Sequence, residues 1–256
     1  MTPRLELKSL SRRFGGLKAV SDVSFEVFPN EIAGVIGPNG AGKTTLFNLI
    51  AGTFKPSGGS VLYDGRDVTG WASDAIARLG IGRTFQAVHA FKSETVFENL
   101  RRAGLLKGCH GPLAAASRWF SRGVDDAVDK VRQTAGFVGL SGSMDKAAGS
   151  LSYGQQKLLG IAMTLMQDPQ LVLMDEPAAG LNPSEKVFLS ELIARLRDER
   201  QQEVLIVEHD MRLIMSVCDR VLVVNQGCRI AVGTPNEIRE DQAVIDAYLG
   251  LDYEFA

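Results

Sequence analysis

A glycine-rich segment near the N-terminus has the residue types of a phosphate-binding loop. Residues 37–45 read G-P-N-G-A-G-K-T-T and match the pattern G-x-x-x-x-G-K-[ST] at every fixed position. Glycines let backbone N–H groups turn toward a phosphate, and a helix N-terminus adds partial positive charge. Lys43 would reach the β- and γ-phosphates, and the Thr44 hydroxyl would bind Mg²⁺. The residues predicted to hold nucleotide phosphate are Gly37, Asn39, Gly40, Ala41, Gly42, Lys43, Thr44 and Thr45.

The residues on either side of this loop supply the elements that it needs. The apolar run 32–36 predicts a buried strand leading into the loop. An apolar helix is expected to leave the loop and to stop at Gly52. This strand–loop–helix context favours a nucleotide site over an ordinary glycine-rich turn.

Two adjacent carboxylates follow a second apolar strand. Residues 171–174 predict a buried strand, and Asp175 and Glu176 come directly after it. The carboxyl ends of parallel strands are where such sheets bind ligands. Asp175 suits Mg²⁺, held directly or through water, and Glu176 is placed to polarise an attacking water as general base. A solvated pair at a strand end is the alternative, which the phosphate loop upstream disfavours.

Two further features are ordinary when taken alone. Ser152 and Gln155 form an S-x-x-Q capping box for a helix over 154–166. His209 follows the apolar strand 204–207, where a single histidine usually just satisfies a hydrogen bond.

The remaining pattern predicts an α/β protein with a β appendage. Alternation over residues 4–28 and at 61–63 predicts a small antiparallel sheet, whereas residues 55–59 are expected to form a loop. Residues 124–131 have helical spacing, and a helix is expected from Pro183 to Arg200.

We expect four parts along the chain. Residues 1–86 hold the N-terminal β subdomain and the first part of a nucleotide-binding core, and residues 87–156 form a helical subdomain. Residues 157–235 complete the core, and 236–256 form a helical tail. Within 101–123, the aromatic residues between arginines are expected to pack inside the helical subdomain; a docking or membrane-proximal surface is the alternative.

Composition sets outer limits on function. The 256 residues are 45% hydrophobic and 23% charged with a net charge of −2, which gives no reason to expect nucleic acid as the main partner. Cys109, Cys218 and Cys228 lack metal-ligand spacing and are expected to be reduced, buried thiols. Without a signal-peptide pattern or a membrane-length apolar run, a cytosolic protein is expected, reaching a membrane only through other subunits.

Seven marks in order resemble ABC-type ATPases over nearly the whole chain. They are Phe14, the loop 37–45, Gln86 in the segment 82–86, the segment 151–156 (L-S-Y-G-Q-Q, the signature segment), Asp175-Glu176, the segment 179–182, and His209 in 207–210. This resemblance implies a P-loop (RecA-like) parallel-sheet core, an N-terminal antiparallel β subdomain and an inserted α-helical subdomain. It also implies hydrolysis of ATP with Mg²⁺.

The resemblance further implies a role for each mark. Phe14 stacks on adenine, Glu176 is the catalytic base and His209 contacts the γ-phosphate. Gln86 senses Mg²⁺ and the attacking water, so the implied metal set is Thr44, Gln86 and Asp175. Ser152, Gly154 and Gln155 contact ATP bound on a second subunit of a head-to-tail dimer.

Four segments point to one subgroup of the ABC-type ATPases. Residues 82–86, 175–183, 207–211 and 243–250 look like the ATP-binding subunit of high-affinity branched-chain amino-acid importers, and residues 104–122 resemble an insertion of the longer of two paralogous ATPases. The implied partners are transmembrane permease subunits, a second ATP-binding subunit in a homo- or heterodimer and, indirectly, a periplasmic or extracellular solute-binding protein. The implied place is the cytoplasmic face of a membrane. Similar ATPases serve urea, short-chain amides or lipopolysaccharide export.

Two other classes fit less well. An ABC ATPase acting on ribosomes or nucleic acid would carry a second core, a coiled coil or a basic surface. A P-loop nucleotide kinase gives no account of the signature segment or of His209.

The chain departs from the family pattern directly after the signature segment. The family usually carries a basic and an acidic residue there, roughly R-L-E-I-A-R-A-L, whereas residues 157–165 read K-L-L-G-I-A-M-T-L. A helical glycine such as Gly160 costs about 1 kcal/mol relative to alanine.

Overall fold

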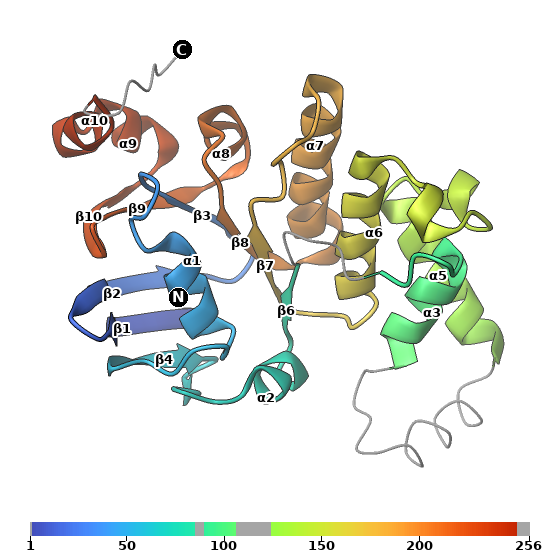
Figure 1. Cartoon of the computed structure of the whole chain (residues 1–256), viewed down its shortest axis with the longest axis horizontal. Helices are drawn as coiled ribbons and strands as arrows, with labels where there is room; N and C mark the ends of the chain where they lie inside the picture. The colour runs from blue at the N-terminus through green and yellow to red at the C-terminus, as the bar shows by residue number, and fades with distance from the viewer. Residues whose placement is uncertain (1, 85–89, 106–123, 250–256) are drawn as a thin grey trace.

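A six-stranded sheet forms the centre of the protein. The computed structural model describes residues 2–84, 90–105 and 124–249. The strand order is β10-β9-β3-β8-β7-β6, in which β10 alone runs antiparallel to its neighbour (Figure 1). The strands are β3 (Ile32–Ile36), β6 (Ile81–Arg83), β7 (Leu171–Asp175), β8 (Glu203–Val207), β9 (Arg220–Asn225) and β10 (Cys228–Gly233). Every residue of β3, β7 and β8 is buried, as is typical of parallel strands covered on both faces.

A smaller antiparallel sheet is formed by the N-terminal residues. Its order is β2-β1-β4-β5. The strands are β1 (Leu5–Phe14), β2 (Leu17–Val27), β4 (Gly58–Tyr63) and β5 (Arg66–Asp67). The predicted appendage is confirmed, but the loop expected over 55–59 is wrong at its end, because Gly58 and Gly59 begin β4. Gly59 has φ 78°, and a Cβ there would lie 2.3 Å from the Ser9 carbonyl oxygen, so the pairing of β4 with β1 needs glycine at this irregular position.

Helix α1 (Lys43–Ile50) joins the two sheets. Its residues Leu46, Phe47, Leu49 and Ile50 are buried in one cluster with apolar side chains from both sheets. This is the apolar helix expected after the phosphate loop. The short helix α2 (Ser73–Arg78) follows the small sheet and leads into β6.

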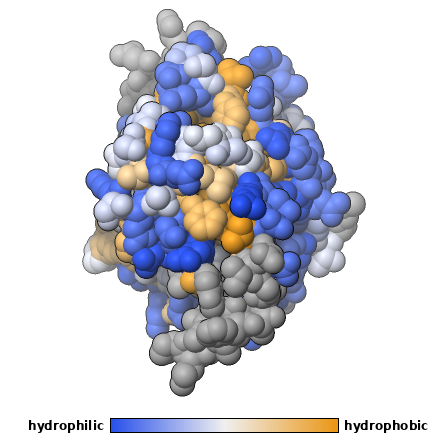
Figure 2. All heavy atoms as spheres, turned by 90° about the vertical axis from the view of Figure 1, so that its right-hand side faces the viewer, coloured by the Kyte–Doolittle hydropathy of each residue, from blue (hydrophilic) through white to orange (hydrophobic). Residues whose placement is uncertain are grey.

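A group of helices packs beside the sheets, at the right of Figure 1. It contains α3 (Val96–Leu105), α5 (Val124–Phe137) and the short 3-10 turns η1 (Ser141–Ser143) and η2 (Ala148–Ser150). The helix predicted from the spacing at 124–131 is α5. Figure 2 views this side and shows apolar side chains in a band with hydrophilic ones on either side of it. Most of the stretch 101–123 lies outside the described residues, so its expected packing stays a prediction.

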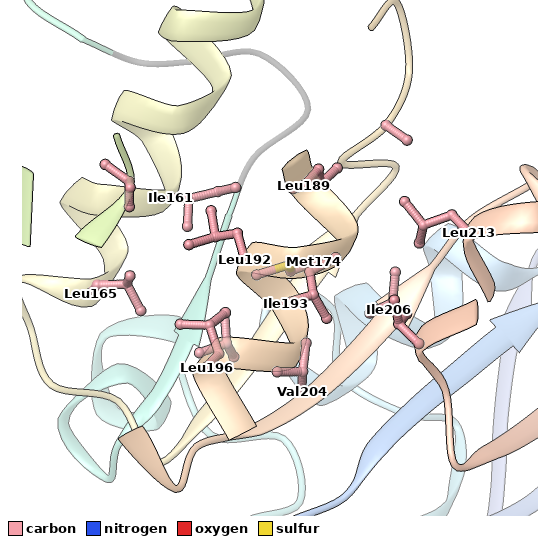
Figure 3. Close-up of a cluster of buried hydrophobic side chains, with 14 of the residues drawn as sticks. Ile161, Leu165, Met174, Leu189, Leu192, Ile193, Leu196, Val204, Ile206 and Leu213 are labelled. Atoms are coloured by element: carbon pink, nitrogen blue, oxygen red, sulfur yellow. The ribbon is translucent and has the colours of Figure 1, made fainter. Parts of the chain in front are cut away.

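The second core lies on the other face of the large sheet (Figure 3). It is covered by α6 (Tyr153–Leu165), α7 (Pro183–Arg200) and α8 (Met211–Val217), and the chain continues through α9 (Pro235–Glu240) and α10 (Gln242–Leu249). Helix α7 has the predicted bounds, because Asn182 caps it and Pro183 stands in its first turn. Figure 3 shows side chains of α6 and α7 meeting those of β7 and β8.

Two of the three cysteines lie within the described residues. Cys218 is buried as expected, but Cys228 is exposed, because it opens the edge strand β10 next to a turn; the expectation of burial was wrong there. Cys109 lies outside the described residues. Among the described helices, none has both the length and the apolar content needed to cross a membrane.

Candidate nucleotide-binding site

The phosphate loop holds its own lysine. It connects β3 to α1, and the Lys43 ammonium donates to the carbonyl oxygens of Gly37 at 2.6 Å and Pro38 at 3.0 Å. Lys43 is only 7% exposed. Burial lowers the pKa of Lys43, and the nearby carboxylates of Glu176 and Asp175 oppose that change. The structure therefore places the predicted phosphate-binding lysine beside both predicted carboxylates.

Two glycines allow the loop to lie against neighbouring backbone. A Cβ on Gly37 would lie 2.0 Å from the Val224 carbonyl oxygen, and one on Gly42 would lie 2.2 Å from that of Ala19. The Gly227 N–H also donates to the Ala41 carbonyl at 2.9 Å. The loop is thus packed against β9 and β2, and only glycine fits at these two close approaches.

Asp175 is held by an arginine at the end of β6. The Arg83 guanidinium donates to Asp175 Oδ2 at 2.9 Å and to Asn48 Oδ1, on α1, at 2.7 Å. Asp175 is buried, whereas Thr44, at the start of α1, is exposed. A hydroxyl and a carboxylate are the hard oxygen donors that Mg²⁺ prefers, so the residues present fit this ion. Sequence reasoning missed β6, because three residues are too short for a strand pattern.

Glu176 has an unusual backbone conformation. Its φ is 48°, in the left-handed region that side chains other than glycine rarely occupy. Its N–H donates to the Val207 carbonyl at 2.9 Å, and its own carbonyl accepts from Lys157 Nζ at 2.9 Å. Such conformations cost of order 1–3 kcal/mol and cluster at active sites. Seven other described non-glycine residues share this region, so what distinguishes Glu176 is its place directly after β7, near Lys43.

His209 is presented to solvent by a buried neighbour. Its side chain is half exposed, whereas the preceding Glu208 is fully buried. Glu208 accepts from the backbone N–H groups of Ala178 at 2.7 Å, His209 at 3.0 Å and Asp210 at 3.2 Å. Sequence reasoning missed Glu208; the signal was a carboxylate directly after the apolar strand, next to a candidate histidine.

The capping box at the start of α6 is confirmed. Ser152 Oγ accepts from the Gln155 N–H at 3.2 Å, and Gln155 Oε1 accepts from the Ser152 N–H at 3.2 Å. Gly154 is buried against α7, since a Cβ there would lie 2.3 Å from Glu185 Oε1. In Figure 1, α6 lies on the far side of α7 from α1. Within one chain, the signature segment is therefore separate from the phosphate loop.

Phe14 and Gln86 complete the predicted set. Phe14 ends β1 and is 40% exposed, with the Phe54 ring centroid at 5.4 Å and the Arg12 guanidinium carbon at 4.6 Å. An exposed aromatic face of this kind suits stacking on a flat ring. Gln86 lies outside the described residues, so its proposed metal-sensing role is not placed.

Known proteins resemble the whole chain. Residues 20–179 match the family described as "ABC transporter", and residues 228–254 match "Branched-chain amino acid ATP-binding cassette transporter". The "High-affinity branched-chain amino acid transport ATP-binding protein LivG" of Escherichia coli (strain K12) is 44% identical, and the similarity covers 97% of this chain and 98% of that protein. The corresponding protein BraF of Pseudomonas aeruginosa has the same identity and coverage.

Solved structures agree with these sequence matches. The crystal structure of the ADP conformation of MJ1267, an ATP-binding cassette of an ABC transporter, superposes with a TM-score of 0.85 at 31% identity. It covers 98% of this chain and 100% of the other. Because one family description matches most of its length and whole-length relatives share 44% of its residues, the chain belongs to the ABC transporter family, as an ATP-hydrolysing ATP-binding cassette.

Proposed function

We propose that this chain is the motor subunit of an importer for branched-chain or related amino acids. The observation that carries the proposal is the match of its C-terminal residues 228–254 to a family described by that substrate class. Whole-length similarity to LivG and BraF supports it, because both are named for high-affinity branched-chain amino acid transport. The four-part division of the chain predicted above is kept as part of this proposal.

The site residues have the following proposed roles. Phe14 stacks on the adenine of ATP, and the loop 37–45 holds its phosphates. Lys43 turns from its two loop carbonyls toward the β- and γ-phosphates. Thr44 and Asp175 would hold Mg²⁺, with Gln86 completing the set; when bound, the ion neutralises phosphate charge. Glu176 takes a proton from the attacking water, and His209 contacts the γ-phosphate.

A second ATP-binding subunit completes each site. The helix N-terminus at Ser152 is exposed, and α7 lies between α6 and α1 in Figure 1, as expected if Ser152, Gly154 and Gln155 contact ATP on the partner. The cassette acts at the cytoplasmic face of a membrane through permease subunits, and a solute-binding protein delivers the solute to them. The apolar side chains on the face shown in Figure 2 support docking of another protein on the helical part of the chain. Phe91, just before α3, is 54% exposed beside Arg102.

The substitution Glu176→Gln tests the ATP mechanism. The variant is expected to bind ATP but not hydrolyse it, since the amide cannot accept the proton of water, and to accumulate as an ATP-bound dimer. ATP turnover and light scattering with and without ATP measure both effects. Glu199→Gln, an exposed carboxylate paired with Arg195 on α7, is the matched control and should behave as the unaltered chain. A monomer at saturating ATP would contradict the shared-site mechanism for the isolated cassette.

Solute uptake tests the proposed substrate. Cells that lack the chain are expected to lose uptake of labelled leucine, and the unaltered chain but not Glu176→Gln should restore it. Affinity capture of Glu176→Gln with ATP from mild-detergent membranes should recover multi-span permease subunits. Loss of urea or amide uptake with normal leucine uptake would redirect the proposal to another solute.

A further inference from the structure

Two buried charges lie beside the catalytic carboxylate without belonging to the predicted site. Lys157 is 7% exposed, in the second turn of α6, and Glu208 is fully buried directly after β8. Charged side chains are almost never buried to this extent unless they are paired or fully hydrogen-bonded. Their partners therefore indicate what they hold in place.

Both charges hold the same short stretch of backbone. The Lys157 ammonium donates to the carbonyl oxygens of Glu176 at 2.9 Å and Pro177 at 3.2 Å. Glu208 Oε1 accepts from the N–H of Ala178 at 2.7 Å, and its Oε2 accepts from the His209 N–H at 3.0 Å. Three consecutive residues after β7 are thus fixed by a cation on α6 and an anion directly after β8.

The charges also support one another. Burial lowers the pKa of Lys157, and the carboxylates of Glu208 and Glu176 oppose that change. Desolvating two charges is costly, so the pair is not explained by stability alone. The charges add a hydrogen bond of fixed direction. Lys157 on α6 donates to the carbonyl of Glu176, the residue whose φ is 48°.

We propose that Lys157 and Glu208 are positioning residues for Glu176. The Lys157 ammonium holds the Glu176 backbone in its left-handed conformation and ties it to α6, the helix whose N-terminus faces the partner's ATP. Glu208 holds the backbone N–H groups of Ala178, in the same stretch, and of His209. The state of the ATP that α6 contacts on one subunit is thereby transmitted to the catalytic base acting on the other ATP. This inference rests on the function proposed above.

The test compares ATP hydrolysis, ADP affinity and thermal unfolding of the full-length chain and its variants. Lys157→Met is expected to lower kcat by about tenfold or more while the ADP Kd stays within about twofold, because a misplaced base slows chemistry without removing phosphate contacts. Lys157→Arg, which keeps a cation with several donors, should retain most of kcat. Lys130→Met is the matched control, since Lys130 donates to the Met166 carbonyl at 2.9 Å at the other end of α6.

A double variant separates positioning from charge balance. Lys157→Met leaves Glu208 without its compensating cation and is expected to lower Tm. Lys157→Met combined with Glu208→Gln removes both charges and should recover part of the lost Tm but not kcat, because the amide keeps one oxygen that accepts from backbone N–H groups. Recovery of both, or a kcat loss in Lys157→Met no larger than that in Lys130→Met, would overturn the proposal.

Two further comparisons allow the result to be interpreted if a variant does not fold or if the unaltered chain is inactive. Should Lys157→Met fail to fold, the double variant and Lys157→Arg provide the comparison of kcat at matched Tm. If the unaltered chain hydrolyses no ATP, the proposed function fails; if it does and the variants follow the control, only the positioning role fails.

Discussion

At the scale of single residues, the ammonium of Lys43 is contacted by oxygen atoms of its own loop. It donates to the carbonyls of Gly37 and Pro38, and in the proposed nucleotide complex these would be exchanged for phosphate oxygens. We expect this exchange to move little more than the Lys43 side chain, because the loop glycines already pack the backbone against β2 and β9.

The pH dependence of ADP binding follows from this lysine. Burial lowers the pKa of Lys43 from its ordinary 10.5 in the nucleotide-free chain, whereas bound phosphates favour the charged form and raise it again. Binding therefore takes up a proton at alkaline pH, and ADP affinity is expected to fall as pH rises through the lowered pKa. ADP titrations across about pH 7 to 10 measure the slope.

Two substitutions at this position are the controls. Lys43→Arg stays charged throughout this range and should flatten the slope, and Lys43→Ala should lose ADP binding and ATP hydrolysis. An unchanged slope in Lys43→Arg would assign the pH effect to another group, and near-normal turnover in Lys43→Ala would contradict the phosphate-loop assignment.

At the scale of elements, the N-terminus of α6 combines a structural and a proposed functional role. Its capping box stabilises the helix within one chain. The same serine hydroxyl is proposed to reach ATP on the partner.

Ser152→Ala should separate these two roles. It is expected to destabilise the chain by about 1 kcal/mol, through loss of the cap, and to prevent the ATP-bound dimer that Glu176→Gln accumulates. Urea unfolding and light scattering in the Glu176→Gln background measure the two effects. Thr234→Ala removes the equivalent capping box of α9 and should give a similar loss of stability with dimerisation intact. Equal dimerisation in both variants would contradict the proposed contact in trans.

At the scale of the whole molecule, the large sheet has an apolar cluster on each face. One cluster joins it to α1 and the small sheet, and the other joins it to α6, α7 and α8. The first cluster holds α1, which follows the phosphate loop. The second cluster holds α6, which carries Lys157.

Leu192→Ala tests the second cluster. Leu192 lies on α7 among side chains of α6 and β7 (Figure 3), and its truncation is expected to destabilise the chain by about 2–5 kcal/mol by leaving a cavity. ADP should raise the Tm of this variant as it does that of the unaltered chain, because the phosphate loop is untouched. Calorimetry with and without ADP provides the measurement. Loss of ADP stabilisation would show that the two clusters are coupled.

The sequence alone determined the features that depend on near neighbours in the chain. The loop 37–45 between strand and helix, the carboxylates after 171–174 and the capping box at Ser152 each have their signal within a few residues. The bounds of α7 were predictable for the same reason, since Asn182 and Pro183 start it locally. Gln86 and the residues 106–123 stay predictions, because they lie outside the described residues.

Only the tertiary structure decided which charges are buried and what they hold. In the sequence, nothing local distinguishes Arg83 or Lys157 from solvent-exposed charges, and Glu208 is marked only by its place directly after an apolar strand. Each is buried or half-buried because segments distant along the chain close over it, and each then bonds to groups that no local pattern connects with it. The exposed Cys228 and the three-residue strand β6 have the same cause, since both depend on sheet position rather than on local propensity. Local patterns thus predicted the chemistry, and long-range packing determined how the backbone of Glu176 is held.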